Sequence, residues 1–172
     1  MKVFLIGYMG CGKSTVGRKL AEKLKLDYID FDKHIEKERR KTISEIFDDE
    51  GEEKFRILEH EYLKKLFKKE NVVIALGGGT PCFHDNIQLI NKNGISVYLK
   101  MSSDTLLTRL SKEKNKRPLI CDLNDVDLKN FIETHLKKRK AFYQKANHII
   151  QSDHHTADNL AEKIIKLIRR GN

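Results

Sequence analysis

Near the N-terminus lies a stretch, GYMGCGKST, whose residue types and spacing suit phosphate binding. Gly7, Gly12, Lys13 and Ser14 match the pattern G-x-x-x-x-G-K-[ST]. Glycines allow successive backbone N–H groups to turn toward one anion, and the N-terminus of a following helix adds partial positive charge. In such a loop the lysine reaches the β- and γ-phosphates of a nucleotide, and the hydroxyl binds Mg²⁺. The stretch therefore predicts a site for ATP with Mg²⁺.

The residues on both sides of this loop favour the same interpretation over a chance match. Residues 3–6 are an unbroken apolar run, which is typical of a parallel strand covered on both faces. Val16, Leu20 and Leu24 recur every four residues, as on the buried side of a helix. We expect nucleotide contacts from Gly10, Cys11, Gly12, Lys13, Ser14 and Thr15. A helix N-terminus lowers the pKa of a thiol, but we expect Cys11 to be an inert filler of the loop.

Two carboxylates, Asp30 and Asp32, follow the next apolar segment. On an extended chain, side chains two residues apart point to one face and lie roughly 6 to 7 Å apart. This separation allows one carboxylate to serve the water shell of a metal ion while the other receives the proton of an attacking hydroxyl group. The alternative for Asp32 is an N-cap, because it opens the helical stretch DKHIEKERR.

The elements that must position these residues alternate along the chain. Strands are predicted at residues 3–6, 28–31, 72–76, 95–99 and 148–150, and helical patterns lie between and after them. Alternation of this kind predicts an α/β fold with a parallel sheet and right-handed crossovers. Ligands of such a fold bind at the carboxyl ends of its strands, where the phosphate-binding stretch and the two carboxylates lie.

Length and composition limit the class of protein. A chain of 172 residues suits a single domain, 1–172, and three widely spaced cysteines indicate neither disulfides nor a metal site. The net charge of +9 arises from 34 basic and 25 acidic residues that are intermixed, which favours solvated helix faces over a nucleic-acid surface. We expect no membrane span, because no apolar run is long enough, and no signal peptide, because Met1 leads directly into the first predicted strand. We expect a cytoplasmic monomer that binds neither nucleic acid nor membrane.

Five further stretches follow the phosphate-binding one in the order DYIDFD, ISEIFDDEGEEKFRILE, ALGGGTP, RPLI and RKAFY. Together they resemble the shikimate kinases over essentially the whole chain. The resemblance implies a three-layer α/β/α fold of the P-loop kinase type with a five-stranded parallel sheet. It also implies a helical substrate-binding segment at about 32–62 and a mobile lid at about 111–122. The implied reaction transfers the γ-phosphoryl group of MgATP to the 3-hydroxyl of shikimate, giving shikimate 3-phosphate and ADP in the chorismate pathway to the aromatic amino acids.

The resemblance also implies roles for individual residues. Ser14 and Asp30 would serve Mg²⁺, and Asp32 would bind the shikimate hydroxyls and act as the base. Lys13 and Arg117 would join Asp32 in catalysis, with Arg117 reaching the phosphates from the lid. The remaining contacts would be Arg109 near the adenine and, around shikimate, Arg56, Gly77, Gly78, Gly79 and Arg139.

The chemistry of the two substrate-binding arginines agrees with these roles, because a guanidinium group pairs bidentately with a carboxylate. A surface salt bridge is the alternative for each of them. The case for this alternative is weaker for Arg56, because its neighbours Phe55 and Leu58 favour the core. The case is stronger for Arg139, which lies within the basic run KKRK. Arg40 replaces a glycine common in the family at the end of a helix, which should alter only a cap.

Three other functions remain as alternatives. A gluconate kinase or a nucleoside-monophosphate kinase would share the phosphate loop but would need other acceptor contacts. A nucleotide-dependent regulatory module would need no acceptor residues at all. The ordered set of Asp32, Arg56, Gly78 and Arg139 favours a shikimate kinase over each of these.

Overall fold

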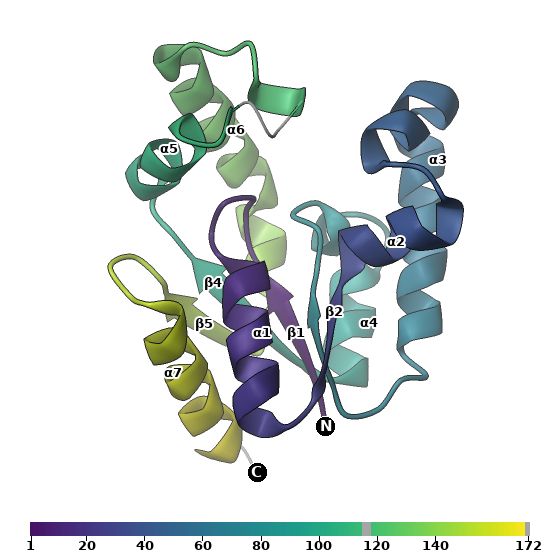
Figure 1. Cartoon of the computed structure of the whole chain (residues 1–172), viewed down its shortest axis with the longest axis vertical. Coiled ribbons are helices and arrows are strands. Elements are labelled where there is room, and N and C mark those ends of the chain that lie inside the picture. Colours follow the sequence, from purple (N-terminus) through teal and green to yellow (C-terminus); the bar gives the residue numbers. More distant parts are fainter. Residues whose placement is uncertain (115–117, 171–172) are drawn as a thin grey trace.

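A parallel sheet of five strands forms the centre of the fold (Figure 1). The computed structural model describes residues 1–114 and 118–170. The strand order is β2-β3-β1-β4-β5, and all four neighbouring pairs are parallel. Parallel neighbours require long crossovers, which the helices between the strands supply. The predicted five-stranded parallel sheet is therefore confirmed.

The elements follow one another in nearly strict alternation. Their bounds are β1 (Lys2–Ile6), α1 (Lys13–Leu24), β2 (Asp27–Asp30), α2 (Phe31–Arg39), α3 (Ile43–Leu66), β3 (Val72–Ala75), η1 (Thr80–Cys82), α4 (Asn86–Asn93), β4 (Ile95–Lys100), α5 (Ser103–Ser111), η3 (Pro118–Ile120), α6 (Asp125–Tyr143), β5 (His148–Gln151) and α7 (Ala157–Arg170). No helix in the described part of the chain is long and apolar enough to span a membrane.

The second strand ends earlier than predicted. Phe31 was expected in the strand but is the first residue of α2, where it is fully buried. The side chain of Asp30 accepts a hydrogen bond from the backbone N–H of Lys33 and so caps the helix. The cap turns the chain from strand to helix at Asp30, whereas the apolar pattern alone suggested that the strand continued.

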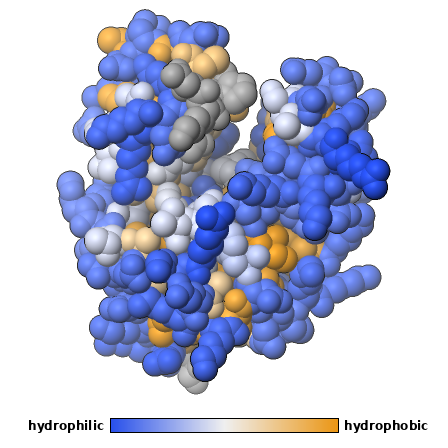
Figure 2. All heavy atoms as spheres, in the orientation of Figure 1, coloured by the Kyte–Doolittle hydropathy of each residue, from blue (hydrophilic) through white to orange (hydrophobic). Residues whose placement is uncertain are grey.

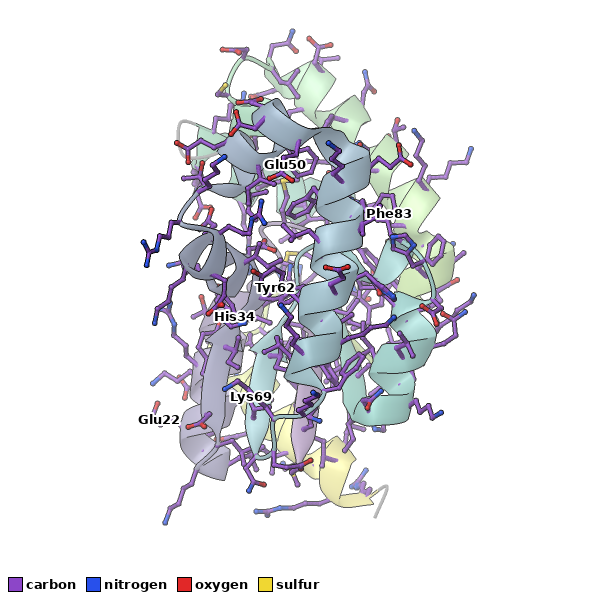
Figure 3. The ribbon with its side chains drawn as sticks, turned by 90° about the vertical axis from the view of Figure 1, so that its right-hand side faces the viewer. Glu22, His34, Glu50, Tyr62, Lys69 and Phe83 are labelled. Carbon is purple, nitrogen blue, oxygen red and sulfur yellow. The ribbon has the colours of Figure 1, made fainter. Side chains whose placement is uncertain are left out.

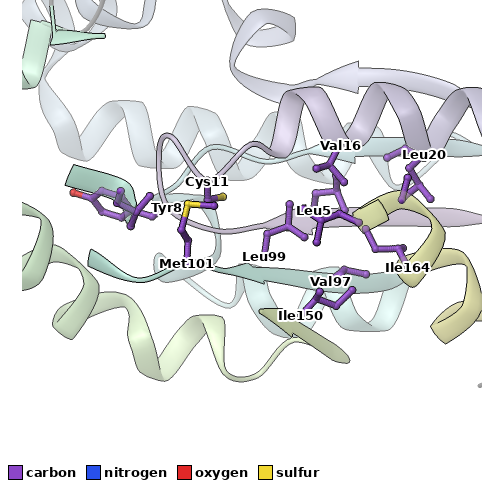
Figure 4. Close-up of a cluster of buried hydrophobic side chains, with 14 of the residues drawn as sticks. Leu5, Tyr8, Cys11, Val16, Leu20, Val97, Leu99, Met101, Ile150 and Ile164 are labelled. Atoms are coloured by element: carbon purple, nitrogen blue, oxygen red, sulfur yellow. The ribbon is translucent and has the colours of Figure 1, made fainter. Parts of the chain in front are cut away.

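The alternation of side chains along β1 divides the apolar core into two parts. Val3 and Leu5 point to one face of the sheet, and Phe4 and Ile6 point to the other. Side chains from α1, α5, α6 and α7 cover the first face, as Figure 4 shows for Leu5, Val97 and Leu99 beside Val16, Leu20 and Ile164. Side chains of α2, α3 and α4 cover the second face. Burial of each such aliphatic side chain stabilises the fold by about 1.5 to 3 kcal/mol.

The carboxyl ends of the strands open into a hollow. Figure 1 shows α5 and α6 on one side of this end and α2 with the first half of α3 on the other. Figure 2 shows the surface hollowed between these two groups of helices, with mostly hydrophilic residues around it. The first turn that follows β1 lies at the base of the hollow, so the fold places the phosphate-binding stretch where ligands of parallel sheets bind.

Candidate active site

Residues 7–15, here called the phosphate loop, connect β1 to α1. Gly10 and Gly12 have φ angles of 80° and 94°, which side-chain-bearing residues rarely adopt. The ammonium group of Lys13 donates hydrogen bonds to the carbonyl oxygens of Gly7 at 2.8 Å and Tyr8 at 3.0 Å. No acidic residue lies in the first turn of α1, so the positive end of its dipole is unopposed there. The loop thus offers an ammonium group and backbone N–H groups to an anion.

Ser14 and Asp30 lie in direct contact beside this loop. The Ser14 hydroxyl donates to Oδ2 of Asp30 at 2.9 Å, and Tyr28 donates to the same oxygen at 3.4 Å. Oxygen atoms of this kind are the ligands that Mg²⁺ prefers, and Mg²⁺ often takes only one or two protein ligands beside phosphates and water. Among the described residues, no group of three or more His, Cys, Asp or Glu side chains is arranged to hold a metal. The Ser14–Asp30 pair therefore fits a magnesium ion that phosphates also hold.

Asp32 occupies the first turn of α2 and not an extended chain. The expectation that Asp30 and Asp32 share one face of a strand is therefore wrong, and so is the alternative that Asp32 caps the helix. Burial of the Asp32 carboxyl group, with the nearby Glu59 carboxylate, raises the pKa of Asp32 to about 6, against the lowering effect of Lys13. A carboxylate with this pKa is a suitable acceptor for the proton of a hydroxyl group near neutral pH.

A second group of residues comes together next to the phosphate loop and is here called the arginine pocket. It consists of Asp32, Arg56, Glu59, Gly77–Gly79 and Arg139. The glycines make this approach possible. A Cβ atom on Gly77 would lie 2.5 Å from Oδ1 of Asp32, and one on Gly79 would lie 2.7 Å from Nη1 of Arg56. A Cβ atom on Gly78 would lie 3.2 Å from Nη1 of Arg139. The three glycines thus line a space that carboxyl and guanidinium groups face.

Arg56, on α3, is held by carboxylates and by aromatic rings. Its guanidinium group donates to Oε2 of Glu59 at 2.9 Å and to Oε1 of Glu52 at 3.0 Å. Its central carbon lies 4.1 Å from the centre of the Phe83 ring, a cation–π arrangement. Figure 3 shows Phe83 beside the half of α3 that is nearer Glu50. Only 12% of the Arg56 side chain is exposed, so the surface salt bridge considered for it does not describe this environment.

Arg139, on α6, has a different environment from Arg56. Its guanidinium carbon lies 5.4 Å from the centre of the Tyr8 ring. Tyr143, one turn later, donates from its hydroxyl group to the carbonyl oxygen of Gly78 at 2.6 Å. The other residues of the basic run, Lys137, Lys138 and Lys140, are exposed, whereas Arg139 is partly buried. Among the described residues no carboxylate pairs with Arg139, so its charge is available to an anionic ligand.

On the nucleotide side, Arg109 of α5 lies against the phosphate loop. Its Nη1 donates to the carbonyl oxygen of Gly10 at 3.3 Å. Arg117 and the middle of the expected lid lie outside the described residues. The described parts on either side of that gap are anchored: Lys114 donates to the carbonyl oxygen of Leu123 at 2.9 Å, and Ile120 is 1% exposed.

Sequence reasoning did not find Glu59, although it is among the most buried charged groups in the pocket. Its side chain is 1% exposed, and it accepts hydrogen bonds from Arg56 and from the hydroxyl group of Thr80. The spacing of Arg56 and Glu59, three residues apart on one helix, was the available indication. Such pairs are common on exposed helices, however, and only the fold shows that this one is buried.

Comparisons with known proteins agree with the resemblance found in the sequence. The family model described as shikimate kinase matches residues 9–169. A shikimate kinase from Flavobacterium johnsoniae is 44% identical over 169 residues, which cover 97% of this chain and 98% of that protein. One from Azobacteroides pseudotrichonymphae is 44% identical over 168 residues, covering 97% of this chain and 99% of that protein.

Two solved structures are similar along nearly their whole length. A crystal structure of shikimate kinase from Bacteroides thetaiotaomicron has a TM-score of 0.94 and 38% identity, and the match covers 98% of each chain. A shikimate kinase from Acinetobacter baumannii in complex with shikimate has a TM-score of 0.90 and 35% identity, covering 99% of this chain and 94% of that one. The fold and the length of this chain therefore agree with those of its relatives.

Proposed function

The chain belongs to the shikimate kinase family, and we propose that it transfers the γ-phosphoryl group of ATP to the 3-hydroxyl of shikimate. The observation that carries the proposal is the position of the arginine pocket directly beside the phosphate loop. Gly78 borders both the arginine pocket and the phosphate loop. A Cβ atom on it would lie 3.2 Å from Nη1 of Arg139 and 3.5 Å from the backbone nitrogen of Met9. A donor phosphate and a small acidic acceptor would therefore meet at this point.

The acceptor side supplies a base and two guanidinium groups. We propose that Asp32 takes the proton of the attacking hydroxyl group, since its raised pKa makes it a stronger base than an exposed aspartate. Arg56 and Arg139 hold the carboxylate of shikimate, and Gly77, Gly78 and Gly79 leave room for its ring. Glu59 neutralises part of the charge around Arg56 and fixes its direction.

On the donor side, we propose that Lys13 contacts the transferred group. With Gly10, Cys11, Gly12, Ser14 and Thr15 it surrounds the phosphates, and its ammonium group stabilises the negative charge that spreads over the phosphoryl oxygens during transfer. We propose that Arg109 lies near the adenine and that Arg117 approaches the phosphates from the lid. Both roles rest on the resemblance to the family.

Ser14 and Asp30 are the residues that would hold Mg²⁺. A bound magnesium ion offsets the charge of the β- and γ-phosphates. Asp30 has a second task in this chain, because its other carboxylate oxygen caps the helix that carries Asp32. Binding of ATP with and without Mg²⁺, compared between the wild type and Ser14→Ala, tests the assignment. Equal Mg²⁺ dependence in the two proteins would contradict it.

Release of ADP with a panel of acceptors tests the function as a whole. The panel consists of shikimate, gluconate, AMP, CMP and no acceptor. We expect turnover that depends on shikimate and on Mg²⁺ together. Turnover with gluconate or a nucleotide would favour another kinase of the same fold, and equal ADP release without any acceptor would favour a nucleotide-dependent switch.

We propose a single domain, 1–172, in which residues of about 32–62 bind the acceptor and those of about 111–122 form the lid. We also propose a cytoplasmic monomer. No disulfide joins Cys11, Cys82 or Cys121, which suits a reducing compartment. Sedimentation at several protein concentrations tests the oligomeric state.

A further inference from the structure

Tyr8 lies between the phosphate loop and the arginine pocket, and neither set of roles above includes its side chain. It belongs to the loop by its backbone, whose carbonyl oxygen accepts hydrogen bonds from Lys13 and from the N–H of Cys11. Its side chain is 1% exposed. The guanidinium carbon of Arg139 lies over its ring, 5.4 Å from the ring centre. One residue therefore joins the element that binds the donor to a residue that binds the acceptor.

The surroundings of Tyr8 fix the ring in this place. Its hydroxyl group lies 3.4 Å from Nδ1 of His135, which is one turn before Arg139 on α6. The His135 ring in turn packs against Phe131, with ring centres 4.0 Å apart. Burial raises the pKa of Tyr8 to about 12, so the ring stays neutral. Burial and the nearby Arg139 and Lys138 lower the pKa of His135, which therefore adds no second positive charge beside Arg139 near neutral pH.

Arg139 depends on such neutral contacts more than Arg56 does. Two carboxylates fix the direction of Arg56. In the described residues Arg139 has no carboxylate partner, and its contacts include the Tyr8 ring and the hydroxyl group of Tyr143. An aromatic face orients a guanidinium group without neutralising it, so the full charge is left for a substrate carboxylate.

We propose that Tyr8 is a positioning residue that holds Arg139 in the arginine pocket, so that the shape of the phosphate loop affects the binding of shikimate. The inference rests on the proposed function, because it takes Arg139 as a ligand of the shikimate carboxylate. It is specific to the ring face of Tyr8. A residue that merely filled the core at this position would influence stability and would leave substrate binding unchanged.

Steady-state kinetics of Tyr8→Leu test the proposal. Loss of a partly desolvated cation–π contact should raise the KM for shikimate about 2- to 30-fold, while the KM for ATP changes less than about twofold. Tyr8→Phe keeps the ring face and should recover most of the loss. In an Arg139→Lys background, Tyr8→Leu should have less than about a twofold further effect, because the two residues act through one contact. If Tyr8→Leu does not fold, Tyr8→Met gives the same comparison with a side chain that fills irregular space.

Phe67→Leu is the matched control, since Phe67 packs on Phe4 at the opposite end of the sheet. It should lower the thermal midpoint without changing the KM for shikimate. Four results would overturn the proposal: an unchanged KM for shikimate in Tyr8→Leu, an equal rise in the KM for ATP, a loss in Tyr8→Phe as large as in Tyr8→Leu, or a full Tyr8→Leu effect in the Arg139→Lys background. Failure of the proposed function itself looks different, because the wild type would then show no shikimate-dependent ADP release.

Discussion

The phosphate loop and the arginine pocket solve the problem of binding an anion in different ways. The phosphate loop is one continuous stretch, which acts through backbone N–H groups, a helix N-terminus and a single lysine. The arginine pocket takes side chains from α2, α3 and α6, and places them around the turn after β3. Its arginines contact other protein groups: Arg56 donates a hydrogen bond to Glu59, and Arg139 lies over the ring of Tyr8. A backbone site is determined locally, whereas a side-chain site depends on the whole fold.

Lys13→Ala should have the largest effect, because it removes the one side-chain charge at the centre of the phosphate loop. We expect kcat to fall by several orders of magnitude, since this ammonium group acts on the phosphoryl group during transfer. The fold should be retained, since within the described residues the hydrogen bonds of the Lys13 ammonium group all go to atoms of its own loop. Circular dichroism and thermal unfolding serve as the control. A variant with nearly normal kcat would show that the loop is not the catalytic donor site.

Asp32→Asn tests the other side of the comparison. The amide has the same size and still contacts a hydroxyl group, but it does not take up its proton. We expect kcat to fall by about 10² to 10⁴ fold, the usual range for a general base, with ATP binding unchanged. If only the thermal midpoint changed, Asp32 would have a purely structural role in α2.

The raised pKa of Asp32 predicts how stability depends on pH in the nucleotide-free protein. The folded pKa of about 6 lies above the value of the unfolded chain, so the folded protein binds more protons between about pH 4 and 6. Stability contributed by the neutral carboxyl group is therefore lost as the pH rises through this window. Asp32→Asn keeps a neutral group, so its free energy of unfolding should rise relative to the wild type, by up to about 3 kcal/mol. Denaturant unfolding of both proteins at pH 4 and pH 7.5 measures the difference in their free energies of unfolding. If that difference were the same at both pH values, the pKa of Asp32 in the folded protein would be normal.

Arg56→Lys and Arg139→Lys compare the two arginines with each other and with the loop. Loss of a charge-assisted hydrogen bond costs about 1.5 to 3 kcal/mol, roughly 10 to 150 fold in kcat/KM for shikimate. The KM for ATP should stay nearly unchanged, and the double variant should lose less than the sum because both residues hold one carboxylate.

We expect the larger loss for Arg56→Lys, because it also disturbs the buried Glu59 carboxylate. An analogue of shikimate without the carboxylate should bind weakly to the wild type and be indifferent to both changes. If these variants weakened ATP binding and left shikimate binding unchanged, the arginines would belong to the ATP site.

The same contrast explains what the sequence allowed us to predict. The phosphate loop, its flanking strand and helix, and the parallel sheet follow from local patterns, and the structure has them in the predicted places. The pocket residues Arg56 and Arg139 are 83 positions apart in the sequence, and periodicity gives no reason to bring them together. Only the resemblance to a family predicted that they share a site.

The end of the second strand was predicted wrongly, and the buried Glu59 was missed. Phe31 continues the apolar pattern of the second strand, but the hydrogen bond from Lys33 to Asp30 starts a helix one residue earlier. Glu59 was not found because it lies among other charged residues in EHEYLKK, and the sequence alone does not show which of them is buried. In both cases the deciding contact is a side chain whose partner or burial becomes visible only in three dimensions.

The smallest expected effect concerns the backbone at the end of α2. In the phosphate loop the left-handed positions 10 and 12 are glycines, whereas the C-cap of α2 is Arg40, with φ 52° and ψ 32°. A residue with a side chain is strained in this conformation by roughly 1 kcal/mol or somewhat more. Arg40→Gly should therefore raise the free energy of unfolding by about 1 kcal/mol and the thermal midpoint by about 2 to 4 °C.

Arg40→Ala is the matched control, because it removes the same charge and keeps the Cβ atom, and it should give no such gain. Arg40 is exposed and makes no ion pair within the described residues, so the kinetic constants should stay within about twofold in both variants. Equal stabilisation by glycine and alanine would mean that the charge of Arg40, and not its backbone conformation, limits the stability of the helix that carries Asp32.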